Sequence, residues 1–189
     1  MKVALYKGKR GGFAGAFDAA VRWWTRGAYS HVELVFSDGM SASASARDGG
    51  VRFKRIDFKP EHWDFIDLSV DEEHLRTLIL KRLEQESEQN RQIADNLAKA
   101  LIAQCLTQVF DEKYARAFFE ERRGLRYDYF GLFGFVWRPH SGSALLWFCS
   151  EIVMGALKFD DPWQFNPNMV GTIARRLTAH RAMHVTTAK

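Results

Sequence analysis

The stretch between residues 30 and 58 constrains the fold more than any other part of the 189-residue chain. It holds three short segments with strand composition, "SHVELVF", "MSASASA" and "GGVRFKRIDF". Turn signals separate them: "SDG" at 37–39 between the first two, and Asp48, Gly49 and Gly50 where the second passes into the third. The stretch is therefore predicted to form three short strands joined by tight turns.

The first of these strands carries two titratable residues on one face. Alternation along a strand puts His31 and Glu33 together with Val35, and it leaves the opposite face to Val32, Leu34 and Phe36. At a rise of ~3.3 Å per residue, the Cβ atoms of His31 and Glu33 lie roughly 6–7 Å apart, so the carboxylate can bridge to the ring. Two interpretations stay open: an edge strand whose polar residues face water, or a carboxylate that orients a functional histidine.

Helical patterns account for much of the remaining chain. Apolar residues recur at helical spacing from Phe13 to Trp24, and strands are predicted at "KVALYKG" and "HWDFIDLSV". From about Val70 to Arg123 the chain is almost wholly helix-forming, with a polar interval at 84–92. A helix beginning at Cys149 follows a connector rich in glycine and aromatic residues, and "MVGTIARRL" is a short helix or strand.

Cys149 is one of only two cysteines in the chain. If Ser150 and Glu151 open a helix, the thiol lies where unpaired backbone N–H groups and the helix dipole favour an anion and can supply oxyanion donors. The alternative is a buried cysteine that acts as a small apolar residue, and the segment alone favours that interpretation. Cys105 lies in an apolar helical stripe and is predicted to belong to the core.

A thiolate nucleophile needs a general base, and histidine is the usual one. Only His31 lies within a strong strand pattern. His180 and His184 have the spacing of a metal-binding pair but lack a third ligand, so no metal site is expected. The other histidines have surface explanations: His62, His74 and His140.

Composition favours a single globular domain over residues 1–189, with 47% apolar residues. Two cysteines 44 positions apart argue against a disulfide framework or a structural zinc site, and no cofactor is expected. The net charge of +4 permits an anionic partner, but a solvated basic face is the favoured interpretation, with no nucleic acid expected. Without a signal peptide or a membrane-spanning run, we expect a cytoplasmic protein.

Three segments together resemble a known family. They are "YSHVELVFSDG", "RYDYFGLFGF" and "WFCSEIV", and they resemble the circularly permuted NlpC-type papain-like cysteine hydrolases. The histidine strand precedes the cysteine helix, which is the order of the permuted branch. The resemblance spans roughly residues 1–70 and 124–175, including "NPNMVGTIA" after the cysteine helix. The helical stretch at about 85–120 is longer than the single helix expected between the sheet and the Tyr-Asp-Tyr segment, and it is interpreted as an insertion.

The resemblance implies an α+β papain-like fold with an antiparallel sheet packed against the cysteine helix. It implies Cys149 as nucleophile and His31 as base. In many relatives the third polar residue comes from the next strand, where this chain offers Ser41 and Ser43, so Glu33 is expected to take that role, or one of these serines weakly. Ser41 and Ser43 are also candidates to contact the substrate. Tyr127 and Tyr129 match the aromatic connector and either line the cleft or pack in the core.

The function expected from these residues is hydrolysis of an amide bond, in a peptide or cell-wall peptide, through a Cys–His thiolate mechanism. Three alternatives remain. The same site could serve a lipid or thioester acyltransferase or hydrolase, and for either a peptide or an acyl-containing substrate the basic character of the chain suits an anionic molecule. The fold could be a non-catalytic binding module. The arginine clusters could bind nucleic acid or a membrane surface.

Overall fold

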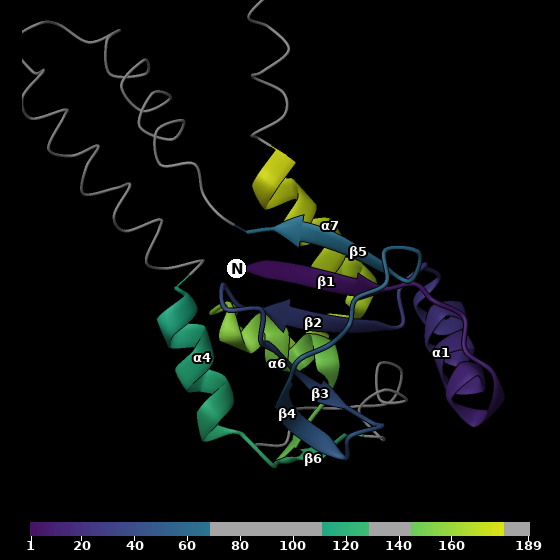
Figure 1. Cartoon of the computed structure of the whole chain (residues 1–189), viewed down its shortest axis with the longest axis horizontal. Coiled ribbons are helices and arrows are strands. Elements are labelled where there is room, and N and C mark those ends of the chain that lie inside the picture. Colours follow the sequence, from purple (N-terminus) through teal and green to yellow (C-terminus); the bar gives the residue numbers. More distant parts are fainter. Residues whose placement is uncertain (69–110, 129–144, 180–189) are drawn as a thin grey trace, which may run out of the picture.

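The computed structural model describes residues 1–68, 111–128 and 145–179, with side chains up to 175 (Figure 1). Its strands form one seven-stranded sheet in the order β5-β1-β2-β3-β4-β6-β7. The strands are β1 (Lys2–Tyr6), β2 (His31–Val35), β3 (Ser41–Ser45), β4 (Gly50–Lys54), β5 (Trp63–Asp67), β6 (Arg126–Tyr127) and β7 (Leu146–Trp147). Neighbours pair antiparallel except β6 and β7, which are parallel. The predicted α+β class with a mainly antiparallel sheet is confirmed.

The three strands predicted between residues 30 and 58 are β2, β3 and β4. Glycines turn the chain between them: Gly39 has φ 77° and Gly49 has φ 81°, a conformation that side chains with a Cβ rarely adopt. β2 pairs with β1 on one side and with β3 on the other, so it lies inside the sheet. The interpretation of an edge strand with His31 and Glu33 facing water is therefore wrong.

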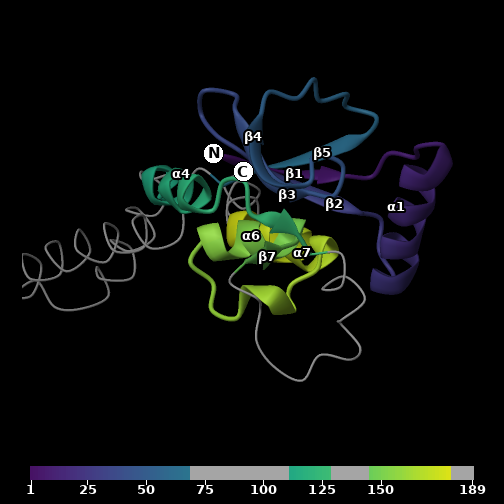
Figure 2. The ribbon, with the colours of Figure 1, turned by 90° about the horizontal axis from the view of Figure 1, so that it is seen from below.

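Helices cover one face of the sheet. They are α4 (Glu112–Glu121), α6 (Cys149–Ala156) and α7 (Pro167–Ala179), with a short 3-10 turn, η2 (Pro162–Gln164), between the last two. α6 packs on β2 and β3, and α7 packs on β1, β2 and β5 (Figure 2). Another helix, α1 (Gly12–Thr25), lies to one side of the sheet (Figure 1). Its last residue, Thr25, accepts a hydrogen bond from the side chain of Asn168 in α7 at 2.8 Å.

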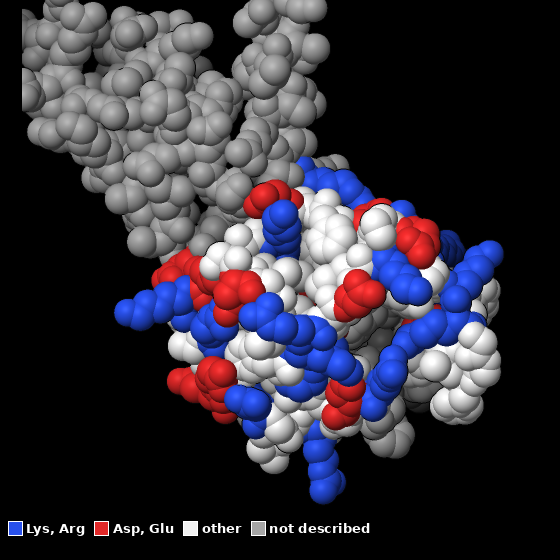
Figure 3. All heavy atoms as spheres, viewed as in Figure 1, with Lys and Arg blue, Asp and Glu red and all other residues white. Residues whose placement is uncertain are grey.

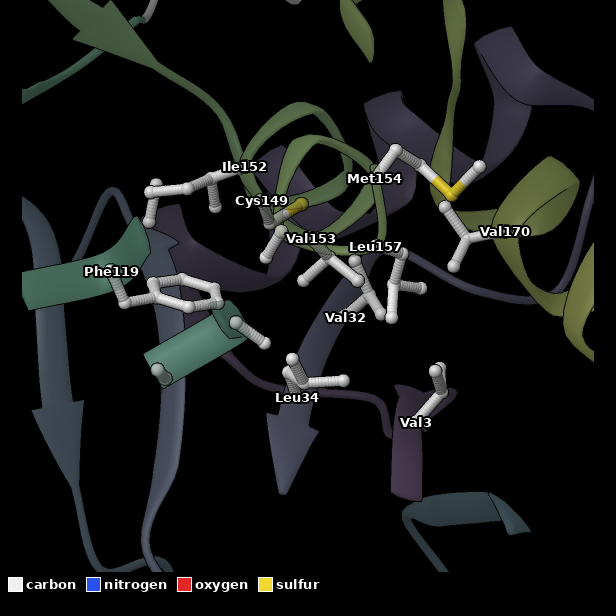
Figure 4. Packing of buried hydrophobic residues seen from close by; sticks show 14 of the residues in the cluster. Val3, Val32, Leu34, Phe119, Cys149, Ile152, Val153, Met154, Leu157 and Val170 are labelled. Atoms are coloured by element: carbon white, nitrogen blue, oxygen red, sulfur yellow. The ribbon is translucent and has the colours of Figure 1, made fainter. Parts of the chain in front are cut away.

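The core lies between α6 and the sheet. Every residue of α6 is buried, as expected for a helix that is apolar on most of its surface. In Figure 4, Val153 of α6 and Leu157, the residue after the helix, lie over Val32, Leu34 and Val3 from the strands. The alternation predicted for β2 thus directs its apolar face at the core.

α4 begins inside the stretch interpreted as an insertion. Asp111 caps it by accepting a hydrogen bond from the Tyr114 N–H at 2.9 Å. Ala115 and Phe119 are fully buried, and α4 packs against α6, so this end of the stretch belongs to the core. Three predicted features lie outside the described residues: residues 85–110 of the insertion, the helix expected to begin near Val70, and the core position of Cys105.

No helix in the described ranges is both long and apolar enough to cross a bilayer.

Candidate active site

Cys149 is the first residue of α6, as the sequence predicts. The preceding residue, Phe148, has the extended backbone of a helix N-cap, and its N–H donates to the Glu151 carboxylate at 3.3 Å. The thiol group is attached where a helix leaves its first N–H groups without intrahelical partners and where its dipole favours negative charge. The side chain of Cys149 is 1% exposed and lies against Val153 at the start of the helix (Figure 4).

His31 is the first residue of β2, so the beginnings of β2 and α6 meet. Its ring forms a hydrogen bond with Cys149, and its Nε2 lies 2.7 Å from Glu33 Oε1. Since Nε2 is engaged by the carboxylate, Nδ1 is the ring nitrogen that remains for the thiol. The His31 side chain is 19% exposed, and it is the part of the pair that reaches solvent.

The surroundings of His31 favour its protonated form. Burial lowers the pKa of the ring, but the charge and hydrogen bond of Cys149, followed by those of Glu33, outweigh burial and raise the pKa to about 9. An imidazolium at neutral pH stabilises an adjacent thiolate. The geometry therefore places a protonated His31 beside the Cys149 side chain.

Glu33 is 0% exposed and is held on two sides. Arg52 donates to both of its oxygens, from Nη1 to Oε2 at 2.6 Å and from Nη2 to Oε1 at 2.5 Å. Burial raises the pKa of Glu33, but the hydrogen bonds of Arg52 and His31 outweigh that effect, so the pKa is lowered. Glu33 is thus a buried carboxylate that stays ionised between two cationic groups.

Arg52 reaches Glu33 across one intervening strand. Ser43 pairs with Arg52 between β3 and β4, and the register of β2 with β3 places Glu33 opposite Ser43. Because the Ser43 side chain is small, it does not block the Arg52 guanidinium from extending over β3 to Glu33. On its other side, Arg52 Nε donates to Asp48 at 2.8 Å, and Lys54 donates to the same carboxylate at 2.9 Å.

Sequence reasoning did not identify Arg52. The sequence does contain a signal for it. Arg52 is a basic residue on the second predicted strand after the histidine strand, and two tight turns bring that strand back beside the others. A buried carboxylate on a central strand needs a cationic partner, and a bidentate arginine is the side chain best suited to that geometry.

The serines predicted as third catalytic or substrate-binding residues are placed otherwise. Ser41 and Ser43 are both 0% exposed. The Ser41 hydroxyl donates to the Lys54 carbonyl at 2.8 Å, and the Ser43 hydroxyl donates to the Val32 carbonyl at 2.7 Å. Fully buried hydroxyls that donate to the backbone are not placed to contact a substrate, so the geometry does not support those roles.

The structure describes one of the two connector tyrosines. Tyr127 is 5% exposed and belongs to the apolar core, which favours the packing role over a position in the cleft. Tyr129 lies outside the described residues.

The described ranges contain no group of three or more His, Cys, Asp or Glu side chains that could hold a metal ion. Four of the remaining histidines lie outside those ranges: His74, His140, His180 and His184. His62 packs edge-on against Tyr6, with ring centroids 6.3 Å apart.

Comparisons of the chain with protein-family models, curated proteins and solved structures find no match.

Proposed function

We propose that the protein is a cysteine hydrolase of the permuted papain-like type that cleaves an amide bond by acyl transfer through Cys149. The observation that carries the proposal is the contact between Cys149, at the start of α6, and a histidine whose pKa is raised to about 9. A cysteine that only packed in the apolar core would need neither this contact nor a buried carboxylate in contact with the histidine.

The reaction would proceed in two stages. Cys149 Sγ attacks the carbonyl carbon as thiolate, and N–H groups at the start of α6 supply hydrogen bonds to the developing oxyanion. His31 donates its proton to the leaving nitrogen, the C–N bond breaks and a thioester forms. Water then attacks the thioester while His31 takes its proton, and the thiolate leaves with the electron pair of the C–S bond.

Glu33 and Arg52 would act through His31. The carboxylate fixes the ring by its 2.7 Å contact at Nε2, which leaves Nδ1 toward the thiol, and it stabilises the imidazolium. Arg52 holds the carboxylate in place and keeps it ionised. Both are positioning residues in this proposal.

An amide is the favoured substrate because of its leaving group. An amine must be protonated before it departs, whereas an alkoxide or thiolate leaves with less assistance. A histidine that keeps its proton up to a pH of about 9 is suited to that task. The lipid or thioester alternatives use the same Cys–His chemistry, and the non-catalytic module would keep the contact without turnover.

The bond type is tested by trapping the acyl group. The protein is incubated separately with cell-wall peptides and with acyl-ester lipids, and Cys149 is examined by mass spectrometry. We expect peptide cleavage and an acyl adduct on Cys149, with both absent in Cys149→Ala. An acyl-lipid adduct without peptide cleavage would assign the alternative activity, and peptide cleavage that survives Cys149→Ala would contradict the proposal.

The pH dependence of the reaction follows from His31. Its raised pKa means that the ring keeps its proton below a pH of about 9 and loses it above, so kcat/KM is expected to fall on the alkaline side through about pH 9. Glu33→Gln removes one cause of the raised pKa and should move this alkaline limb to lower pH. The pH profiles of both proteins check this, and an unmoved limb in the variant would show that Glu33 does not act on His31.

A further inference from the structure

α1 turns three of its large apolar side chains toward solvent. Phe13 is 91% exposed, Trp23 77% and Trp24 44%, whereas Asp18 and Val21 are the buried residues of the helix. The exposed residues of α1 are Gly12, Phe13, Ala14, Ala16, Ala19, Ala20, Trp23 and Trp24. None of them is charged, so the outer face of α1 is apolar along the whole helix.

Basic residues border this face. Between residues 7 and 26 the sequence has five lysines and arginines and one acidic residue, Asp18. Asp18 is 1% exposed and accepts two hydrogen bonds from Arg10, at 2.7 and 2.8 Å. Lys9 before the helix and Arg26 at its end are both exposed. Figure 3 shows the side of the molecule that carries α1 as uncharged atoms bordered by Lys and Arg side chains.

We propose that the outer face of α1, formed by Phe13, Trp23 and Trp24 and bordered by Lys9 and Arg26, docks on an anionic lipid bilayer. An exposed apolar face of this kind marks a binding surface. Tryptophan and phenylalanine beside basic residues are typical of helices that lie in the membrane interface, where lysine and arginine meet anionic headgroups.

Charge favours the bilayer over a second copy of the chain. A symmetric dimer through α1 would bring the same patch of each copy together, with Lys9 and Arg26 of both copies close to one another. That arrangement places like charges beside the contact, whereas an anionic bilayer supplies the opposite charge.

Docking through α1 also bears on the candidate active site. α1 ends at Thr25, and β2 begins with His31 only six residues later. A bilayer against α1 would therefore lie near the end of the sheet that carries His31. Binding itself requires no chemistry at Cys149, so it stands or fails separately from the proposed hydrolysis.

The test compares vesicles of phosphatidylcholine with vesicles of phosphatidylcholine and phosphatidylglycerol, by co-sedimentation and tryptophan fluorescence. We expect the protein to bind the anionic vesicles at least about tenfold more tightly, with a blue shift of its emission. The double variant Phe13→Ser/Trp23→Ser should lose about tenfold or more of that affinity. Lys9→Glu/Arg26→Glu should lose the preference for anionic vesicles.

Two control variants separate the proposal from its rivals. Phe65→Ser changes an aromatic that is 44% exposed on β5 and should bind like the unmodified protein, as should Cys149→Ala. Absence of binding by the unmodified protein, or unchanged binding by Phe13→Ser/Trp23→Ser, overturns the proposal. Two further results would overturn it: the unmodified protein forms a dimer that Phe13→Ser/Trp23→Ser disrupts, or Phe13→Ser/Trp23→Ser has a lower melting temperature than the unmodified protein. Either result would show that protein, not lipid, covers the face.

Discussion

Replacing Arg52 with methionine is expected to lower the free energy of unfolding by roughly 3–5 kcal/mol, the range for removing one member of a buried ion pair. Glu33 is fully buried and accepts hydrogen bonds from Arg52 at both oxygens. Without the guanidinium, the carboxylate keeps His31 as its partner but loses its bidentate one. Urea denaturation at neutral pH measures the change.

Two further variants make this result specific. Glu33→Gln/Arg52→Met removes both charges and should recover much of the lost stability, because no unpaired charge remains buried. Arg55→Met removes an exposed arginine that donates to the Asp38 carbonyl at 3.1 Å, and it should change stability by less than about 0.5 kcal/mol. If Arg52→Met were no more destabilising than Arg55→Met, the buried ion pair would not have the importance assigned to it here.

The parts of the fold that depend on local pattern could be predicted from the sequence. Strict alternation gave β2 its two faces, and the glycine turns gave β3 and β4 their bounds to within a few residues. The start of α6 at Cys149 also follows from a local signal, because Ser150 and Glu151 suit the first turn of a helix. The i, i+2 spacing of His31 and Glu33 left two interpretations open, a contact between them or exposure of both to water, and the 2.7 Å distance shows the contact.

Contacts that depend on strand register could not be predicted in the same way. Arg52 meets Glu33 because β3 lies between their strands and presents the small Ser43 at the crossing point. That position follows from which strands pair and in what register, and no local pattern near Arg52 encodes it. The same is true of Ser41 and Ser43, which were candidates for the third catalytic residue or for substrate contact although their hydroxyls donate to the backbone within the sheet.

Hydrophobic periodicity also gave an incomplete account of α1. Its apolar residues recur at helical spacing, as they would in a helix that packs on the core. The structure instead buries Asp18, which accepts hydrogen bonds from the exposed Arg10, and leaves Phe13 exposed. Periodicity identifies an apolar face, but it does not say what that face contacts.

Replacing His31 with alanine is expected to reduce the reactivity of Cys149 toward an alkylating agent by at least about tenfold at pH 6. An ordinary thiol has a pKa near 8.5 and is less than ~1% thiolate at that pH. In the proposed mechanism, the protonated ring of His31, whose pKa is raised to about 9, stabilises a negative charge on the sulfur by charge and hydrogen bonding. Loss of the ring removes that stabilisation while α6 and its dipole remain.

The measurement that tests the Cys–His pair most directly is the rate of iodoacetamide alkylation of Cys149 from pH 5 to 9, with and without His31→Ala. Both proteins carry Cys105→Ser, so that Cys149 is the only thiol, and mass spectrometry verifies the alkylated residue. The account predicts rapid alkylation of the intact site at pH 6 and its loss in the variant. Equal rates in the two proteins across the pH range would contradict an activated nucleophile at Cys149.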